Sequence, residues 1–380
     1  MRILYTESSS NLGGQEIQAV TQMVALKQAG HKVILACRRR SRISSIASRA
    51  SIRVIHIPFR NSLHLTSVRM LRRLIRSFRP ELLICHSGHD SNIAGLTRAF
   101  LPGRLSGFSL IRQKTYLTRN TKTFSLNHLC DVVVVPGPVM RDVLIKGGCR
   151  SPVVVVPPGF DFDALRREKR MPLAEHIRLW LKCRDDVPVI VQAGMLRHEK
   201  GQDFMLQTLY RLRLEGQRFL WLIVGSGRLE DEYRLRSDIL SLGMEDCVMM
   251  CGELAPVAPV WRIASLMVMP SRNEAFGMVA VEAAACGVPV MVSDTGGLPA
   301  VIQHGRNGTL LQPDDQEAWL AALHDFFSTP GRFLEMARQA TEDMEARYGI
   351  DGTVGKLLAL GKLYGRARQN TGEPGGWGDE

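Results

Sequence analysis

The stretch MPSRNEAFGMVAVEAAACGVPVMVSDTGG, residues 269–297, decides the fold of this 380-residue chain. It begins at the end of an apolar strand, turns through polar residues and enters a helix of small residues at about Phe276. Glu274 lies just outside this helix and Glu282 two turns inside it, with seven residues between them. A helix N-terminus binds anions, because it offers unpaired N–H groups and the positive end of the helix dipole. Two carboxylates around such a site can hold the two ends of a ligand whose middle is a diphosphate.

Apolar runs and helical patterns alternate on both sides of this stretch, which predicts an α/β protein with two doubly wound parallel sheets. Expected strands include 52–57, 81–87, 107–113, 132–137 and 153–157 in the first half, and 187–194, 219–227, 265–271 and 289–294 in the second. A polar, proline-bearing segment over 158–187 separates the halves. We predict an N-terminal domain over 1–165, a C-terminal domain over 166–348, a helix over 349–369 returning toward the N-terminal domain, and a disordered tail over 370–380.

The first 150 residues carry 24 Lys and Arg against six Asp and Glu, whereas the rest of the chain has a net negative charge. This asymmetry predicts an anionic partner for the first half, such as a membrane surface or a phosphorylated glycan. The helix expected over 65–80 has one apolar side and five arginines. It either packs on the sheet with solvated arginines or lies on anionic lipid. No nucleic-acid-binding motif accompanies the charge, and only 6% of residues are aromatic, so we expect no nucleic-acid partner.

The composition indicates a cytoplasmic protein that can lie peripherally at the inner face of the cytoplasmic membrane. The N-terminus lacks the apolar run of a signal peptide, and no apolar stretch reaches the ~18 residues of a spanning helix. The eight cysteines form no CxxC pair, which argues against a zinc or disulfide framework.

Charged residues follow expected strands in both halves. Arg197 and Lys200 lie in the loop after the strand 187–194, where they are either solvated or cradle a diphosphate together with the helix start. His86 follows the strand 81–87, and Arg112 and Lys114 end the next strand, so all three belong to one sheet edge. A lone histidine is more often structural, but this edge is where such sheets bind ligands.

Two adjacent glycines, Gly13 and Gly14, precede the first helix. They form either a simple tight turn or a loop that approaches the phosphates of a ligand.

An ordered set of motifs resembles the retaining, nucleotide-sugar-dependent glycosyltransferases of family 4, which have the two-domain GT-B fold, two Rossmann-like domains facing across a cleft. The motifs are GGQE at 13–16, VVVVPPG at 153–159, GMLRHEKG at 194–201, LIVGSG at 222–227, PSRNEAFGMVAVEAAACGVPV at 270–290 and TGGLPAVIQHGRNG at 295–308.

The resemblance implies roles for the matching residues. Arg197 and Lys200 would bind the donor pyrophosphate and stabilise the leaving nucleoside diphosphate, so neither a metal nor another cofactor is expected. Glu274 would contact the sugar and Glu282 the ribose. The N–H groups of Phe276, Gly277 and Met278 would lie near the sugar and phosphates, and the loop of Gly13 and Gly14 would close over the phosphates.

Three positions depart from the family pattern. Pro158 and Ala300 stand where many relatives have Asn and Glu, and Arg112-Gln113-Lys114 stands where several place a histidine. We therefore assign a catalytic or acceptor-side role to His86, with Arg112 and Lys114 as further acceptor-side candidates.

The expected function is the transfer of a sugar, with retention, from a nucleotide sugar to a lipid-linked or lipopolysaccharide-type glycan. The alternatives are a soluble small-molecule acceptor, or a non-catalytic module that binds nucleotides or glycans. The intact Arg197, Lys200, Glu274 and Glu282 argue against the non-catalytic module.

Overall fold

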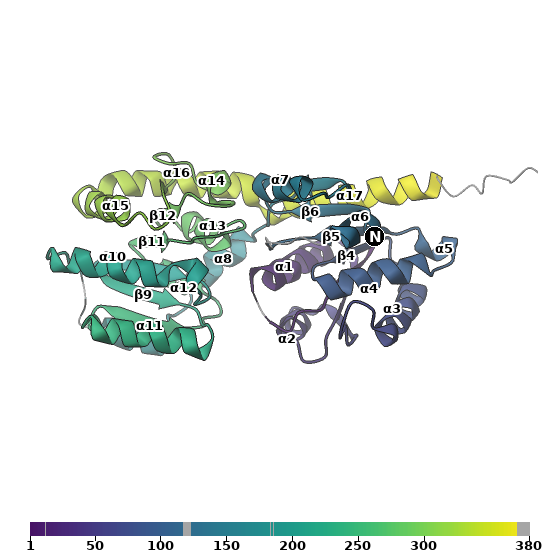
Figure 1. Ribbon diagram of the computed structural model, residues 1–380, viewed down its shortest axis with the longest axis horizontal. Helices are drawn as coiled ribbons and strands as arrows, with labels where there is room; N and C mark the ends of the chain where they lie inside the picture. The colour runs from purple at the N-terminus through teal and green to yellow at the C-terminus, as the bar shows by residue number, and fades with distance from the viewer. Residues whose placement is uncertain (12, 117–122, 183, 185, 371–380) are drawn as a thin grey trace, which may run out of the picture. The chain divides into compact units, whose positions relative to one another are not determined.

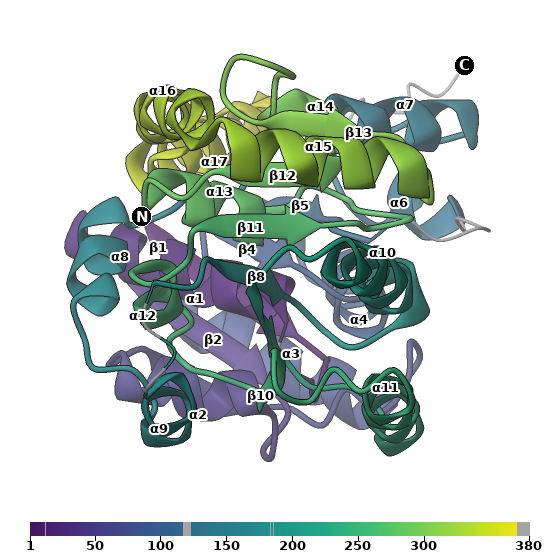
Figure 2. The ribbon, with the colours of Figure 1, turned by 90° about the vertical axis from the view of Figure 1, so that its left-hand side faces the viewer.

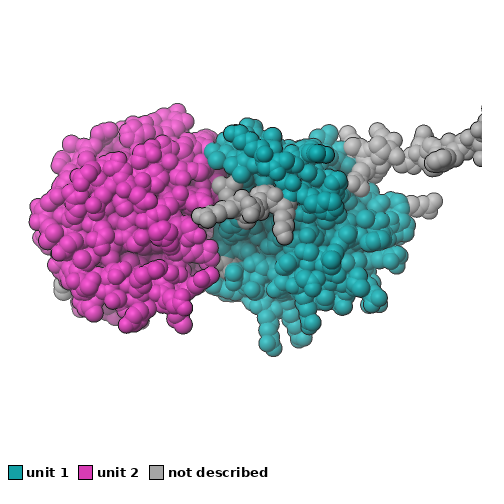
Figure 3. Space-filling view, in the orientation of Figure 1, with its two compact units in different colours: residues 1–160, 350–380 teal, residues 161–349 magenta. Residues whose placement is uncertain are grey.

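The computed structural model describes residues 1–11, 13–116, 123–182, 184 and 186–370. The chain forms two compact units, the first made of residues 1–160 and 350–380 and the second of residues 161–349 (Figure 3). Each unit is a parallel sheet with helices on both faces (Figures 1 and 2), which confirms the predicted pair of doubly wound α/β sheets. Among the described residues, no helix is both long enough and apolar enough to cross a membrane.

The first unit has a seven-stranded sheet of order β3-β2-β1-β4-β5-β6-β7 with parallel neighbours throughout. Its strands are β1 (Arg2–Glu7), β2 (Lys32–Cys37), β3 (Arg53–His56), β4 (Leu82–Cys85), β5 (Ser109–Gln113), β6 (Val132–Val135) and β7 (Val153–Val155). Its helices are α1 (Gly14–Gln28), α2 (Arg42–Arg49), α3 (Leu65–Phe78), α4 (Gly88–Ala99), α5 (Gly103–Ser106), α6 (Phe124–His128), α7 (Pro138–Lys146) and α17 (Ile350–Asn370).

Strand β1 shows why helices cover both faces of this sheet. Successive side chains of a strand point to opposite faces, so Ile3 and Tyr5 enter one apolar core and Leu4 enters the other. Helices α1, α2 and α17 supply the rest of the first core, and α3 and α4 cover the second. Alternate residues of a strand are thus buried on opposite faces of the sheet. Since both faces are buried, the strands appear in the sequence as continuous apolar runs.

The last helix, α17, belongs to the first unit, where we predicted a returning helix over 349–369. It packs against α1 and β5, and the Ser109 hydroxyl donates a hydrogen bond to the Gly361 carbonyl oxygen at 2.5 Å. At its start, the Ile350 N–H donates to the Phe160 carbonyl oxygen at 3.0 Å. The predicted tail over 370–380 lies, except for Asn370, outside the described residues.

The second unit has a six-stranded parallel sheet of order β10-β9-β8-β11-β12-β13. Its strands are β8 (Val189–Ala193), β9 (Leu220–Val224), β10 (Val248–Gly252), β11 (Leu266–Met269), β12 (Val290–Ser293) and β13 (Thr309–Leu311). Its helices are α8 (Phe162–Lys169), α9 (Glu175–Leu181), the 3-10 turn η1 (His198–Lys200), α10 (Gln202–Leu214), α11 (Leu229–Ser241), α12 (Ala258–Trp261), α13 (Met278–Ala285), α14 (Leu298–Val301), α15 (Gln316–Ser328) and α16 (Pro330–Tyr348).

The first unit ends at Phe160 because the following helix, α8, packs within the second unit. Helix α8 contacts α12, and the Lys169 ammonium donates a hydrogen bond to the Cys286 carbonyl oxygen at 2.5 Å. We predicted this boundary at residue 165, and the structure places it at residue 160.

Candidate active site

The loop after β8 packs closely against the loop after β11, and glycine makes this approach possible. Gly201 has φ +68°, and a Cβ atom added there would overlap the Pro270 carbonyl oxygen. The turn η1, which carries Lys200, therefore lies beside the beginning of the 270–277 segment. The carboxyl ends of β8 and β11 meet here, as expected for neighbouring parallel strands.

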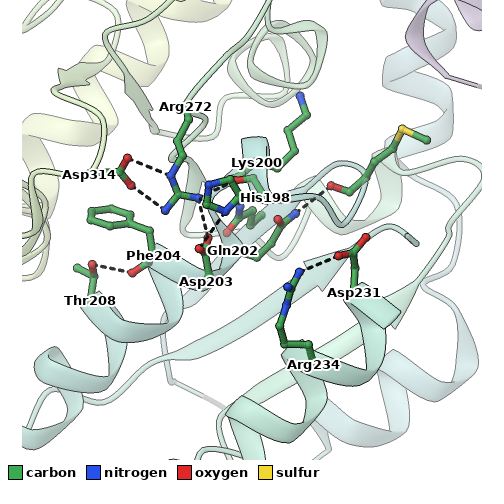
Figure 4. A network of polar contacts seen from close by, with 12 residues as sticks. His198, Lys200, Gln202, Asp203, Phe204, Thr208, Asp231, Arg234, Arg272 and Asp314 are labelled. Carbon is green, nitrogen blue, oxygen red and sulfur yellow. Dashed lines mark hydrogen bonds and ion pairs between the residues drawn. The ribbon is translucent and has the colours of Figure 1, made fainter. Parts of the chain in front are cut away.

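Arg272 holds these two loops together (Figure 4). Its backbone N–H donates to the Glu199 carbonyl oxygen at 2.8 Å, and its guanidinium donates to the His198 carbonyl oxygen at 2.6 Å. The same guanidinium forms ion pairs with Asp203 on α10 at 2.9 Å and with Asp314 at 2.8 Å. Burial disfavours ionisation of Asp203, but hydrogen bonds and the charge of Arg272 outweigh it, so the pKa of Asp203 is lowered.

Sequence reasoning did not single out Arg272, Asp203 or Asp314. Arg272 lies two residues before Glu274, but its two carboxylate partners are far from it in the chain. No local pattern reports such a pairing.

Lys200 and Glu274, predicted to bind phosphate and sugar, contact one another. The Lys200 ammonium nitrogen lies 2.5 Å from Glu274 Oε2, and the two side chains are 28% and 15% exposed. The Lys200 carbonyl oxygen accepts a hydrogen bond from Gln192 on β8 at 2.9 Å. Arg197, in contrast, has an exposed side chain that forms no hydrogen bond or ion pair with another described residue.

The two glycines that follow β12, Gly296 and Gly297, pack against the turn that carries Glu274. The Gly297 N–H donates to the Glu274 carbonyl oxygen at 2.9 Å. A Cβ atom at Gly296, which has φ +56°, would overlap that oxygen, and one at Gly297 would overlap the Ala275 carbonyl oxygen. The glycine pair therefore sets the path of the segment that leads into α13.

Helix α13 begins at Met278 and not at Phe276, so the predicted start is wrong by two residues. The reason is Gly277, which takes φ +95° against the side chain of Leu298 and breaks the helical path. Phe276 is buried and packs edge-on against Tyr348, with ring centroids 5.3 Å apart. The first N–H groups of a helix have no partner within it, so an anion site at this end of α13 stays a prediction.

Glu282 lies about one turn into α13 because of this later start. Its carboxylate is partly buried and makes no hydrogen bond or ion pair with another described residue. Burial, together with the nearby negative charge of Glu168 on α8, raises its pKa to about 7. A carboxylate held without a partner suits a ligand that donates hydrogen bonds, such as a diol.

In the first unit, His86 is only 3% exposed. Its ring stacks on Tyr5 with centroids 5.6 Å apart, and its Nδ1 lies 3.3 Å from the Thr6 carbonyl oxygen. Burial lowers its pKa, which favours the neutral ring. This burial is compatible with a structural role, and the catalytic or acceptor-side role of His86 stays a prediction.

Arg112 and Lys114 differ in their surroundings. The Arg112 guanidinium donates to the Ser87 carbonyl oxygen. Nearby, Asp90 accepts hydrogen bonds from the hydroxyls of Thr6 and Ser8 at 2.7 and 2.9 Å, and burial with the charge of Glu7 raises its pKa to about 7. The Lys114 side chain is partly buried and has no hydrogen bond or ion pair to any other described residue, whereas its backbone N–H donates to the Val134 carbonyl oxygen at 2.8 Å.

The glycine loop of the first unit forms the start of α1. Helix α1 begins at Gly14, and the Gly13 N–H donates to the Glu16 side chain at 2.8 Å. Both interpretations of this loop, turn and phosphate contact, therefore stay open.

The Arg272 contacts predict that Arg272→Ala loosens the loop after β8. Hydrogen bonds to a charged group stabilise by ~1.5–3 kcal/mol, so backbone amides at 197–201 should exchange with deuterium about tenfold faster or more. Hydrogen-exchange mass spectrometry of the purified chain measures this rate. Arg234→Ala is the control, because Arg234 is 67% exposed and pairs with Asp231 three residues away on the same helix. Unchanged exchange at 197–201 in Arg272→Ala would contradict the assigned role.

Two family models match consecutive parts of the chain. The model described as Glycosyltransferase Family 4 matches residues 12–164, and the model described as Glycosyl transferases group 1 matches residues 175–345. Each match covers most of one unit.

Curated relatives match over part of their length. The chain is 29% identical to mannosylfructose-phosphate synthase of Agrobacterium fabrum, over 66% of this chain and 56% of that protein. It is 32% identical to D-inositol 3-phosphate glycosyltransferase of Gordonia bronchialis, over 60% of this chain and 50% of that protein. It is 28% identical to the lipopolysaccharide core biosynthesis mannosyltransferase LpcC of Rhizobium leguminosarum bv. viciae, over 45% of this chain and 49% of that protein. The chain thus spans about half the length of the curated relatives that it matches.

Solved structures share the fold over nearly the whole chain. HepE of Anabaena in complex with UDP and glucose superposes with a TM-score of 0.78 at 17% identity, covering 98% of this chain and all of that one (100%). A glycosyltransferase of Rickettsia africae superposes with a TM-score of 0.81 at 18% identity, covering 96% of this chain and 98% of that one. With its two parallel-sheet units and both family matches, the chain belongs to the family 4-like, group 1 glycosyltransferases of GT-B fold.

Proposed function

We propose that the chain is a retaining glycosyltransferase that moves a sugar from a nucleoside-diphosphate sugar to a glycan acceptor of lipid-linked or lipopolysaccharide type. The observation that carries the proposal is the contact between Lys200 and Glu274 at the start of α13. In a nucleoside-diphosphate sugar, the phosphate is bonded directly to the sugar. A cation that binds the phosphate and a carboxylate that binds the sugar must therefore lie next to one another, as Lys200 and Glu274 do. The lipopolysaccharide mannosyltransferase among the relatives supports this acceptor class.

Each charged group has a defined part in the proposed reaction. Lys200 and Arg197 hold the diphosphate, so that Glu274, released from Lys200, accepts hydrogen bonds from the sugar hydroxyls. The bond from the anomeric carbon to the phosphate oxygen breaks, and an acceptor oxygen bonds to that carbon on the same face. The acceptor proton passes to the departing phosphate. The two cations and the α13 N-terminus stabilise the growing negative charge, so the proposed reaction needs no metal.

A second acceptor class, a small phosphorylated molecule, is favoured by a different observation. Two relatives carry the names mannosylfructose-phosphate synthase and D-inositol 3-phosphate glycosyltransferase. The basic first half of this chain is compatible with either acceptor.

The structure leaves the arginines of α3 available for an anionic membrane surface. Leu71 and Ile75 of this helix are buried in the core with α4, so its apolar side packs on the sheet. The arginines Arg69, Arg73 and Arg76 are exposed on the other side. Just before and at the helix start, Leu63 and Leu65 are also exposed, at 71% and 68%. We propose that this surface contacts anionic headgroups while the helix stays packed.

Release of nucleoside diphosphate from UDP-, GDP- and ADP-sugars, in EDTA and with lipid-linked or phosphorylated saccharides as acceptors, tests the proposed reaction. Lys200→Ala should reduce turnover by about 10²-fold or more, because it removes charge stabilisation from the transition state. Lys182→Ala, which removes an exposed lysine of the same unit, should leave turnover unchanged. Full activity of Lys200→Ala would refute its role, and no turnover with any donor would refute the proposed function.

Donor affinity should depend on the ionisation of Glu282. The ionised carboxylate accepts two ribose hydrogen bonds, and its pKa is raised to about 7 by burial and by Glu168. The KM for the donor should therefore fall as the pH rises through about 7, by about tenfold per unit below the midpoint. Glu168→Gln removes the like charge and should shift the midpoint to lower pH. An unchanged midpoint in Glu282→Gln would exclude Glu282 as the titrating group.

Reversing three exposed arginines of α3 tests the membrane contact. Each basic residue near an anionic surface contributes ~1 kcal/mol, so Arg69, Arg73 and Arg76 changed to Glu should weaken vesicle binding by roughly a hundredfold. Co-sedimentation of the chain with vesicles that contain phosphatidylglycerol measures this binding. A matched variant with Arg178, Arg218 and Arg236 changed to Glu alters the net charge equally in the second unit. Equal loss in both variants would show that only the total charge matters.

A further inference from the structure

A small cavity lined by polar and apolar side chains lies at the carboxyl edge of the sheet in the first unit. Its volume is 30 Å³, and its lining residues are Gln15, Gln18, Gln22, Gln113, Lys114, Thr115, Val134, Val135, Pro136, Val156 and Pro158. A water molecule needs ~10–15 Å³ by the same kind of measure, so the space admits about two waters. It can take a hydroxyl or one oxygen of a phosphate or carboxylate, but not a sugar ring.

One wall of the cavity is held rigidly by glutamines of α1. The Gln18 side chain exchanges two hydrogen bonds with the Gly159 backbone, at 2.8 and 3.0 Å. Gln15 donates to Glu7 at 2.8 Å and accepts from the Thr115 hydroxyl at 2.7 Å. These amides are used within the protein, so they shape the cavity and leave the binding of a ligand to its other lining groups.

A third glutamine of α1, Gln22, keeps hydrogen-bonding capacity toward the cavity. The Gln22 amide oxygen accepts from the Tyr5 hydroxyl at 3.1 Å and from the Gln113 amide at 3.2 Å. This arrangement leaves the Gln22 NH2 group without a hydrogen-bond partner among the described residues. A donor from Gln22 therefore faces the same space as Lys114.

Lys114 is the cation of this cavity, and no described carboxylate pairs with it. The nearest acidic groups of this sheet edge are already engaged. Glu7 accepts from the Ser9 N–H at 2.8 Å and from Gln15, and Asp90 accepts from Thr6 and Ser8. Burial and the charge of Arg112 lower the pKa of Lys114. A half-buried ammonium without a counter-ion is costly, and an incoming anion would offset that cost.

We propose that Lys114 and this cavity bind an oxyanion, a phosphate or a carboxylate, that is carried by the acceptor. One oxygen of the anion enters the cavity and accepts a hydrogen bond from the Gln22 NH2 group, and the remaining charge lies against the Lys114 ammonium. The inference rests on the proposed glycosyltransfer function and narrows its acceptor to molecules with a negative charge. The anion comes either from a phosphorylated saccharide or from the phosphate that joins a glycan to its lipid.

Binding of inorganic phosphate tests the site independently of turnover. The chain with Arg197→Ala and Lys200→Ala lacks the proposed diphosphate site, and isothermal titration should still detect one bound phosphate. Adding Lys114→Ala should weaken that binding at least tenfold, whereas adding Lys146→Ala, an exposed lysine of the same unit, should not. Equal affinity with and without Lys114 would overturn the proposal. If Lys114→Ala proves unfolded by circular dichroism, Lys114→Arg must keep the binding and Lys114→Gln must lose it.

Kinetics with matched acceptors separates the two proposals. In the otherwise natural chain, phosphate should compete with the acceptor, and Lys114→Ala should raise the KM of a phosphorylated acceptor more than that of its dephosphorylated form. A water-soluble sugar phosphate and a lipid-linked saccharide, assayed in parallel, identify the source of the anion. Equal effects on both forms of the acceptor would overturn the anion site while the transferase function stands. Phosphate binding at Lys114 without any sugar transfer would overturn the transferase function instead.

Discussion

The candidate active site depends on the fork-shaped hydrogen bonding of one arginine. Arg272 joins the turn after β8, the first turn of α10 and the segment before α15, because a guanidinium can bind two carboxylates and a carbonyl at once. Lysine has no such geometry. The position of Lys200, and hence its contact with Glu274, follows from this attachment. Glycines at 201, 296 and 297 allow the backbones to approach closely enough for it.

In the first unit, hydrogen bonds and not ion pairs hold the buried carboxylates of Glu7 and Asp90 in place. Buried Glu7 and Asp90 take their partners from hydroxyls, amides and N–H groups, which satisfies them inside the unit. The same network leaves the Lys114 side chain without a counter-ion among the described residues of the sheet edge. The surplus of positive charge in the first 150 residues is therefore also present locally at this sheet edge.

Much of the fold could be predicted because its signals are local. Apolar runs of four to seven residues marked most of the strands, and the loops after β8 and β11 carried the charged residues that line the site. The short strand β13 gave no comparable signal. The start of α13 was misplaced because Gly277 adopts its backbone angle against Leu298, a contact made across 21 positions of the chain. The partners of Arg272, Asp203 and Asp314, were not predicted because they too are distant from it in the chain.

By itself, the sequence determined the alternation that builds two parallel sheets and the placement of Arg197, Lys200, Glu274 and Glu282 at their carboxyl edges. Periodicity and loop position are sufficient for both, because they depend on near neighbours in the chain. Only the tertiary structure decided which charges are satisfied. It paired Lys200 with Glu274, buried His86 against Tyr5 and left the Lys114 side chain without a partner among the described residues. Ion pairing and burial depend on distances between distant segments, and those distances exist only in the folded chain.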